Sequence, residues 1–63
     1  MATFKVKTPQ GFTTLEGHLE KSVQVATSLY YQIVSPEGVY YLVMLDGVSH
    51  IIPKERFWHV YNS

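Results

Sequence analysis

One stretch decides the fold of this 63-residue chain: residues 39–52, VYYLVMLDGVSHII. Two apolar runs flank Asp46-Gly47, and both of these turn residues tolerate the positive φ that a two-residue hairpin turn requires. Val, Ile and Tyr, which dominate the runs, are residues enriched in strands. The stretch therefore predicts a β-hairpin with strands over Val39 to Leu45 and Val48 to Ile52.

The turns on either side of Val39 to Leu45 set the register of two hairpins. Ser35-Pro36-Glu37-Gly38 places proline second and glycine fourth, the preference of a type I turn. It predicts the pairs Val34 with Val39, Gln32 with Tyr41 and Tyr30 with Val43. A two-residue turn at Asp46-Gly47 predicts the pairs Leu45 with Val48, Val43 with His50 and Tyr41 with Ile52.

The N-terminal part predicts another hairpin. Thr3 to Thr8 alternates, with Phe4 and Val6 on one side, which is the period of a half-buried strand. The turn Thr8-Pro9-Gln10-Gly11 resembles the later Ser-Pro-Glu-Gly turn, and Phe12 to Leu19 follows as the second strand. Gly17 inside that strand is expected to mark a bulge or a bend.

Val23 to Val34 is expected to form one strand, with a helix as the alternative. Ser22 is a suitable helix cap, and several apolar residues of the segment also fall at helical spacing. The strand is favoured because Val, Thr, Tyr and Ile are enriched in strands, and no run of Leu, Glu, Lys and Ala supports a helix.

The C-terminal end predicts one helical turn over Pro53 to Phe57, begun by the proline, and a short last strand over Trp58 to Asn62. The expected fold is therefore all-β: a single domain over residues 1–63. It is a small antiparallel five- to six-stranded barrel or strongly bent sheet, with one helical turn before the last strand. This layout resembles that of Src-homology-3-like (SH3-like) and Sm-like small barrels, although the chain carries no sequence motif of either family.

Composition narrows the function classes. Hydrophobic residues make up 46% and charged residues 16%, with a net charge of +0, so the chain is expected to fold and has no basic stripe for duplex DNA. There is no cysteine, which excludes disulfides and thiolate metal sites. No stretch is long and apolar enough for a spanning helix, and no signal-peptide pattern is present, so no membrane is expected and the expected location is cytoplasmic.

The predicted register makes both faces of the sheet apolar. One face holds Tyr30, Gln32, Val34, Val39, Tyr41, Val43, Leu45, Val48, His50 and Ile52, and the other holds Leu29, Tyr31, Ile33, Tyr40, Leu42, Met44 and Ile51. An antiparallel sheet in a monomer usually buries only one face. The second face must be closed by barrel curvature, by a second copy or by a partner. The expected partner or self interface consists of Tyr30, Tyr41, Val43, Leu45 and His50.

No pattern of catalytic residues or ligands is evident. His18, His50 and His59 have no metal-ligand spacing, and Ser49 and His50 point to opposite faces of a strand, which excludes a local triad. The isolated glycines form no phosphate-binding loop. We therefore expect no catalysis, no metal and no cofactor.

The leading hypothesis is a non-catalytic, protein-binding accessory or regulatory module of adaptor or inhibitor type. It would act through an aromatic and apolar sheet face, because Tyr and Trp are enriched at binding hot spots. It would also self-associate as a homo-oligomer, because a second copy would cover the second apolar face. The alternative is a small barrel that binds single-stranded nucleic acid, with bases stacked on aromatic rings beside cations. Its contacts would be Lys5, Lys7, Lys54, Arg56 and Trp58.

Overall fold

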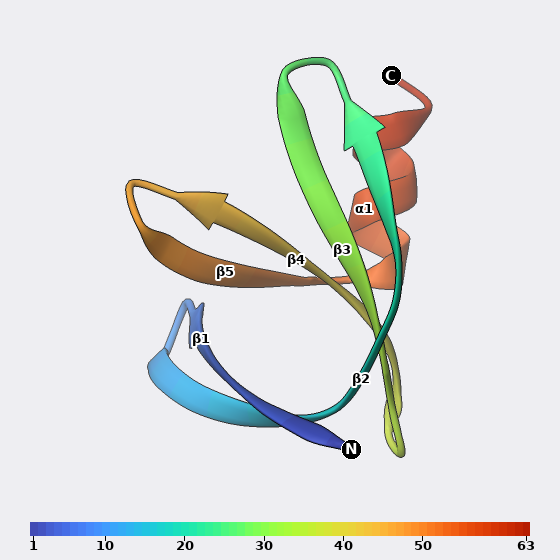
Figure 1. Cartoon of the computed structure of the whole chain (residues 1–63). Coiled ribbons are helices and arrows are strands. Elements are labelled where there is room, and N and C mark those ends of the chain that lie inside the picture. The colour runs from blue at the N-terminus through green and yellow to red at the C-terminus, as the bar shows by residue number, and fades with distance from the viewer.

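The computed structural model describes residues 1–63 as five strands and one helix (Figure 1). The elements are β1 (Ala2–Thr8), β2 (Gly11–Val25), β3 (Ser28–Ser35), β4 (Gly38–Leu45), β5 (Val48–Pro53) and α1 (Lys54–Tyr61). The predicted all-β architecture is confirmed.

The strands follow one another in a ring, and each pairs antiparallel with the next. The ring closes through β1 and β5, which run parallel and pair at a single position, Lys7 with His50. Because one pair makes this seam, the ring is closed without being a regular barrel.

The register predicted for the two later hairpins is confirmed in full. In the β3–β4 hairpin Tyr30 pairs with Val43, and in the β4–β5 hairpin Val43 pairs with His50. The Asp46-Gly47 turn has φ values of 53° and 77°, the left-handed backbone that its residues were expected to supply.

β2 bends sharply and pairs with two neighbouring strands, β1 and β3. Its first half pairs with β1 as far as Gly17, and its second half pairs with β3 from His18 onward, with an irregularity between Leu19 and Lys21. Gly17 is buried at this corner, and a Cβ there would lie 2.5 Å from the carbonyl oxygen of Val34. A glycine is required because only the absence of a side chain lets β3 approach so closely.

The prediction of strand over Val23 to Val34 is confirmed except at Ala26-Thr27. There the chain turns between β2 and β3, so the segment forms parts of two strands and its expected continuity as one strand is wrong. The helical alternative is wrong as well. The turn carries none of the usual signals: Ala26 adopts a φ of 54°, and neither residue is Gly, Pro, Asn or Asp. The β2–β3 ladder, which extends from the pair Val25 and Ser28 to the pair His18 and Val34, holds a residue without turn preference in a left-handed conformation.

Ala26→Gly is expected to stabilise the chain by up to about 1 kcal/mol. A left-handed conformation costs an alanine roughly 1–2 kcal/mol, and a glycine at this position avoids that cost. Glycine loses more backbone entropy on folding, which offsets about 0.5–1 kcal/mol of the gain. Chemical denaturation measures the difference. Thr27→Gly is the control, because Thr27 has no positive φ to relieve and its replacement should not stabilise. A stabilisation equal at both positions would contradict this explanation.

The short last strand expected over Trp58 to Asn62 is also wrong. The helical turn that begins after Pro53 continues to Tyr61, so the helix follows the last strand and no strand comes after it. The alternation of Trp58, Val60 and Asn62 is compatible with a strand, yet Phe57, Val60 and Tyr61 also fall at helical spacing. Docking of Phe57 on the sheet favours the helix over the strand.

No helix of the chain is long and apolar enough to span a bilayer.

The core lies inside the ring. Val6, Leu15, Ile33 and Leu42 form its buried cluster, and the partly buried residues packed around it are Phe4, Tyr31, Tyr40 and Ile51. This is the face of the later strands that carries Leu42, so curvature of the sheet covers it. The opposite face of β3, β4 and β5 lies outside the ring, where α1 packs.

Candidate functional site: the groove between β5 and α1

α1 docks on the outer face of the sheet through Phe57, the one buried side chain of the helix. The ring of Phe57 is fully buried and stacks on that of Tyr41, with centroids 3.7 Å apart and planes inclined by 7°. Tyr30 meets Phe57 edge-on at 5.1 Å. Gln32 donates a hydrogen bond from Nε2 to the Tyr41 hydroxyl at 2.9 Å. Tyr41, only 1% exposed, therefore belongs to the packing of the chain itself.

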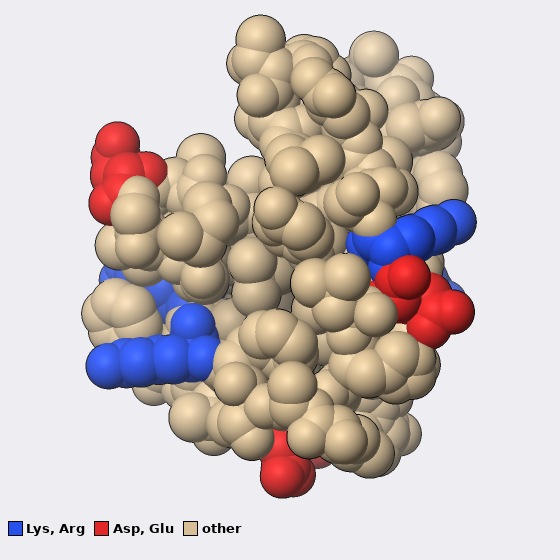
Figure 2. All heavy atoms as spheres, viewed as in Figure 1, with Lys and Arg blue, Asp and Glu red and all other residues tan.

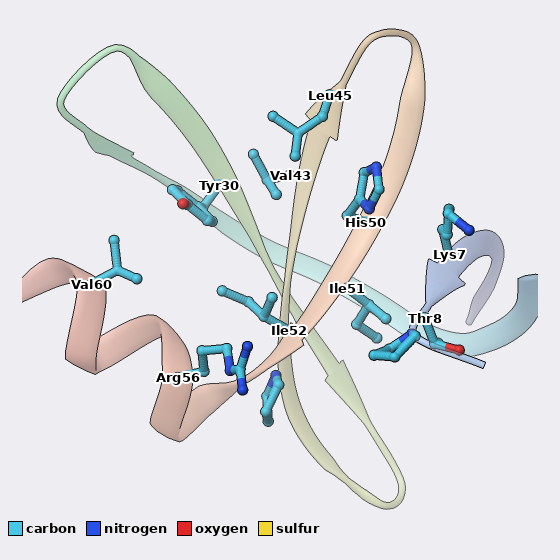
Figure 3. Close-up of a pocket in the computed structure, with 12 residues that line it drawn as sticks. Lys7, Thr8, Tyr30, Val43, Leu45, His50, Ile51, Ile52, Arg56 and Val60 are labelled. Atoms are coloured by element: carbon cyan, nitrogen blue, oxygen red, sulfur yellow. The ribbon is translucent and has the colours of Figure 1, made fainter. Parts of the chain in front are cut away.

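Beside this helix the outer face remains open as a groove of about 580 Å³ (Figure 3). The β4–β5 hairpin contributes Val43, Leu45, His50, Ile51 and Ile52 to it. Val43 is buried in its lining, whereas Leu45 is 48% exposed. We call this depression the β5 groove. Its lining includes four of the five residues expected at an interface, and Tyr41 is the one that it leaves out.

Three other elements complete the β5 groove. α1 contributes Arg56 and Val60 next to Pro53 at the end of β5, and the end of β1 with the turn after it contributes residues 7–9. Tyr30 of β3 also lines it. The sequence interpretation missed Val60 as a groove residue because it placed Val60 in a strand. The helical spacing of Phe57 and Val60 was the signal that could have revealed this wall. The other lining residues that it did not name as site residues are Thr8, Pro9, Ile51, Ile52 and Pro53.

The lining of the β5 groove carries cations and no carboxylate. Lys7 and Arg56 contribute their positive charges, His50 contributes an imidazole, and no Asp or Glu lines the groove. The one close contact between a basic and an acidic side chain of the chain joins His18 Nε2 and Glu20 Oε2, 2.7 Å apart and both exposed on β2. Neither groove cation is therefore paired with a carboxylate of its own chain.

Of the five residues expected to contact nucleic acid, the structure brings only Lys7 and Arg56 to the β5 groove. Lys5 lies on β1, where its ammonium group and that of Lys7 each stand 5.3 Å from the centroid of the exposed Phe12 ring. Lys54 and Trp58 lie on α1, and the Trp58 ring packs edge-on against Phe57 at 5.3 Å. On the face shown in Figure 2, Lys and Arg side chains lie at opposite sides with uncharged surface between them.

The three histidines lie on different elements: His18 on β2, His50 on β5 and His59 on α1. No group of three or more His, Cys, Asp or Glu side chains is placed to hold a metal ion. Ser49 donates a hydrogen bond from its hydroxyl to the Met44 sulfur at 2.9 Å, and so turns away from its neighbour His50.

The chain is thus a small all-β protein, a closed ring of five strands with a helix on its outer face. Comparison with protein-family models, with curated proteins and with solved structures finds no match to it. The shape and chemistry of the β5 groove therefore supply the grounds for inferring a function.

Proposed function

We propose that the chain is a non-catalytic protein-binding module, of adaptor or inhibitor type, that holds part of a partner in the β5 groove. The observation that carries this proposal is the character of the lining. Aliphatic side chains from β4, β5 and α1 converge on an open depression, and two of them, Leu45 and Val60, stay substantially exposed. Exposed apolar residues gathered in a concave site favour a partner that buries them.

The aliphatic lining favours a protein over a nucleic acid. Single-stranded nucleic acids bind largely by stacking their bases on exposed aromatic rings. Tyr30 is the one Phe, Tyr or Trp residue of the groove, and its ring already packs edge-on against Phe57. Val43, Ile52 and Val60 instead suit the aliphatic side chains of a polypeptide. Self-association belongs to the same proposal, since a second copy could bury the same residues.

Leu45→Glu is expected to reduce partner capture at least about tenfold, because it places a charge where an apolar contact forms, and tenfold corresponds to about 1.4 kcal/mol. Met44→Glu is the matched control. Met44 is 50% exposed against 48% for Leu45 and adjoins it on β4, but it lies outside the groove. Affinity capture from a lysate of the source organism, quantified for the wild-type chain and both variants, measures the difference.

Circular dichroism establishes that both variants keep the fold. Equal capture by the two variants would contradict a role for the β5 groove. Binding of a labelled oligonucleotide, with affinity that falls steeply as salt is raised, would favour the nucleic-acid alternative instead. Light scattering over a dilution series, with the same two variants, tests self-association: a dimer lost in Leu45→Glu and kept in Met44→Glu supports it.

A further inference from the structure

We propose that the segment held in the β5 groove is an extended, acidic stretch of the partner, which pairs with the free edge of β5 as an additional strand between Lys7 and Arg56. This inference rests on the proposed function and adds to it the conformation and the charge of the bound segment.

The composition of the lining shows which side of β5 the groove exposes. Four consecutive residues, His50 to Pro53, line it. Successive residues of a strand point to opposite faces, and Ile51 packs against the inner core while Ile52, which pairs with Tyr41, belongs to the outer face. Residues of both faces line the same groove only if the groove runs along the edge of the strand.

That edge is paired with no strand over its last three residues. β4 pairs with one edge of β5 as far as Pro53, whereas β1 pairs with the other edge only at His50. One residue beyond Lys7 the chain leaves β1 and turns at Pro9. Ile51, Ile52 and Pro53 therefore border the groove with an unpaired edge.

An unpaired strand edge presents backbone N–H and C=O groups that can pair with another chain. Addition of an extended peptide to such an edge is a recurring mode of recognition, in which main-chain hydrogen bonds give affinity and flanking pockets give specificity. At about 3.3 Å per residue the free edge is roughly 10 Å long. Because alternate residues of β5 direct their backbone groups at β4, only the remaining residues of this edge present theirs to an added strand. Pro53, which has no N–H, limits the pairing at the end next to α1.

The charges beside this edge select an acidic segment. Lys7 pairs with His50 at one end of the free edge, and Arg56 lies on α1 just beyond Pro53 at the other end (Figure 3). Both cations lack a carboxylate partner in the chain, and no carboxylate lines the groove. Arginine binds carboxylates with two parallel hydrogen bonds, and charge-assisted hydrogen bonds are stronger than neutral ones. Because the net charge of the chain is +0, this preference is a local property of the groove.

The test is a selection from a displayed random-peptide library against the full wild-type chain. We expect the selected peptides to be enriched in Asp and Glu among apolar residues. One of them, synthesised, should bind the double variant Lys7→Glu/Arg56→Glu at least about tenfold more weakly. Lys21→Glu/Lys54→Glu makes the same change in net charge outside the groove and should bind normally. Circular dichroism of both double variants checks the fold.

Strand addition has its own readouts. In an antiparallel or parallel ladder only alternate residues of the peptide direct their N–H groups at β5. Methylation of the backbone nitrogens at one set of alternate positions should therefore weaken binding at least about tenfold, and methylation at the other set should not. Amide hydrogen exchange at Ile51 or Ile52 should slow in the complex.

Three outcomes would overturn the inference. They are selected peptides without acidic enrichment, binding indifferent to the pattern of N-methylation, and failure to select any peptide. The proposed function would survive each of them if partner capture still depended on Leu45. If partner capture did not depend on Leu45, both the proposed function and this inference would be contradicted. Displacement of the selected peptide by an oligonucleotide would assign the groove cations to phosphate binding and would overturn the inference as well.

Discussion

Replacing Phe57 by alanine is expected to cost about 3–5 kcal/mol, the range for removing a buried aromatic side chain. A 63-residue chain has a total stability of about 3–9 kcal/mol by the usual scaling with length, so this one substitution would remove much of it. The effect is large because Phe57 is the only buried residue of α1 and stacks on Tyr41. Without it, α1 loses its anchor and the β5 groove loses one wall.

Phe12→Ala is the control for this prediction. It makes the same substitution at a phenylalanine that is 59% exposed and contacts two lysine ammonium groups, for which a loss below about 1 kcal/mol is expected. Chemical denaturation gives both values. Trp58, the single tryptophan, adjoins Phe57 and should report undocking as a change in its fluorescence. Equal stability of the two variants would show that α1 contributes no cover to the sheet.

Gly17→Val is expected to cost about 3 kcal/mol, the upper end of the range for overpacking. An added Cβ would lie 2.5 Å from the carbonyl oxygen of Val34 and 3.0 Å from the Ile33 side chain. The first contact is with the backbone of β3, which cannot move aside by a change of rotamer. β2 and β3 would have to separate at the corner where the ring bends.

Thr14→Val is the control for Gly17→Val. It introduces the same side chain on the same strand at an exposed position opposite Lys5, where valine suits a strand and a change within about 0.5 kcal/mol is expected. Denaturation midpoints of the two variants measure the difference. A Gly17→Val variant as stable as Thr14→Val would mean that the corner tolerates a side chain and that Gly17 is not needed for the bend.

The candidate site was predictable in part. The turn residues Asp46 and Gly47 placed Val43 and His50 opposite each other, and the same register gathered four of the five expected interface residues into the β5 groove. Tyr41 was expected at an interface, but it is buried because α1 covers it. The sequence interpretation ended the helix at Phe57, and so it could supply neither this cover nor the wall formed by Val60.

The sequence by itself determined the turns and the register wherever a residue restricts its own backbone. Pro36, Asp46 and Gly47 act locally, since proline fixes its φ and the other two tolerate a positive φ. Only the tertiary structure decided the turn at Ala26 and the course of the chain after Phe57. Ala26 is held in a strained conformation by strand pairing, and a helix of eight residues is too short to be stable alone. Both depend on contacts with distant residues, and a local pattern does not contain the free energy of those contacts.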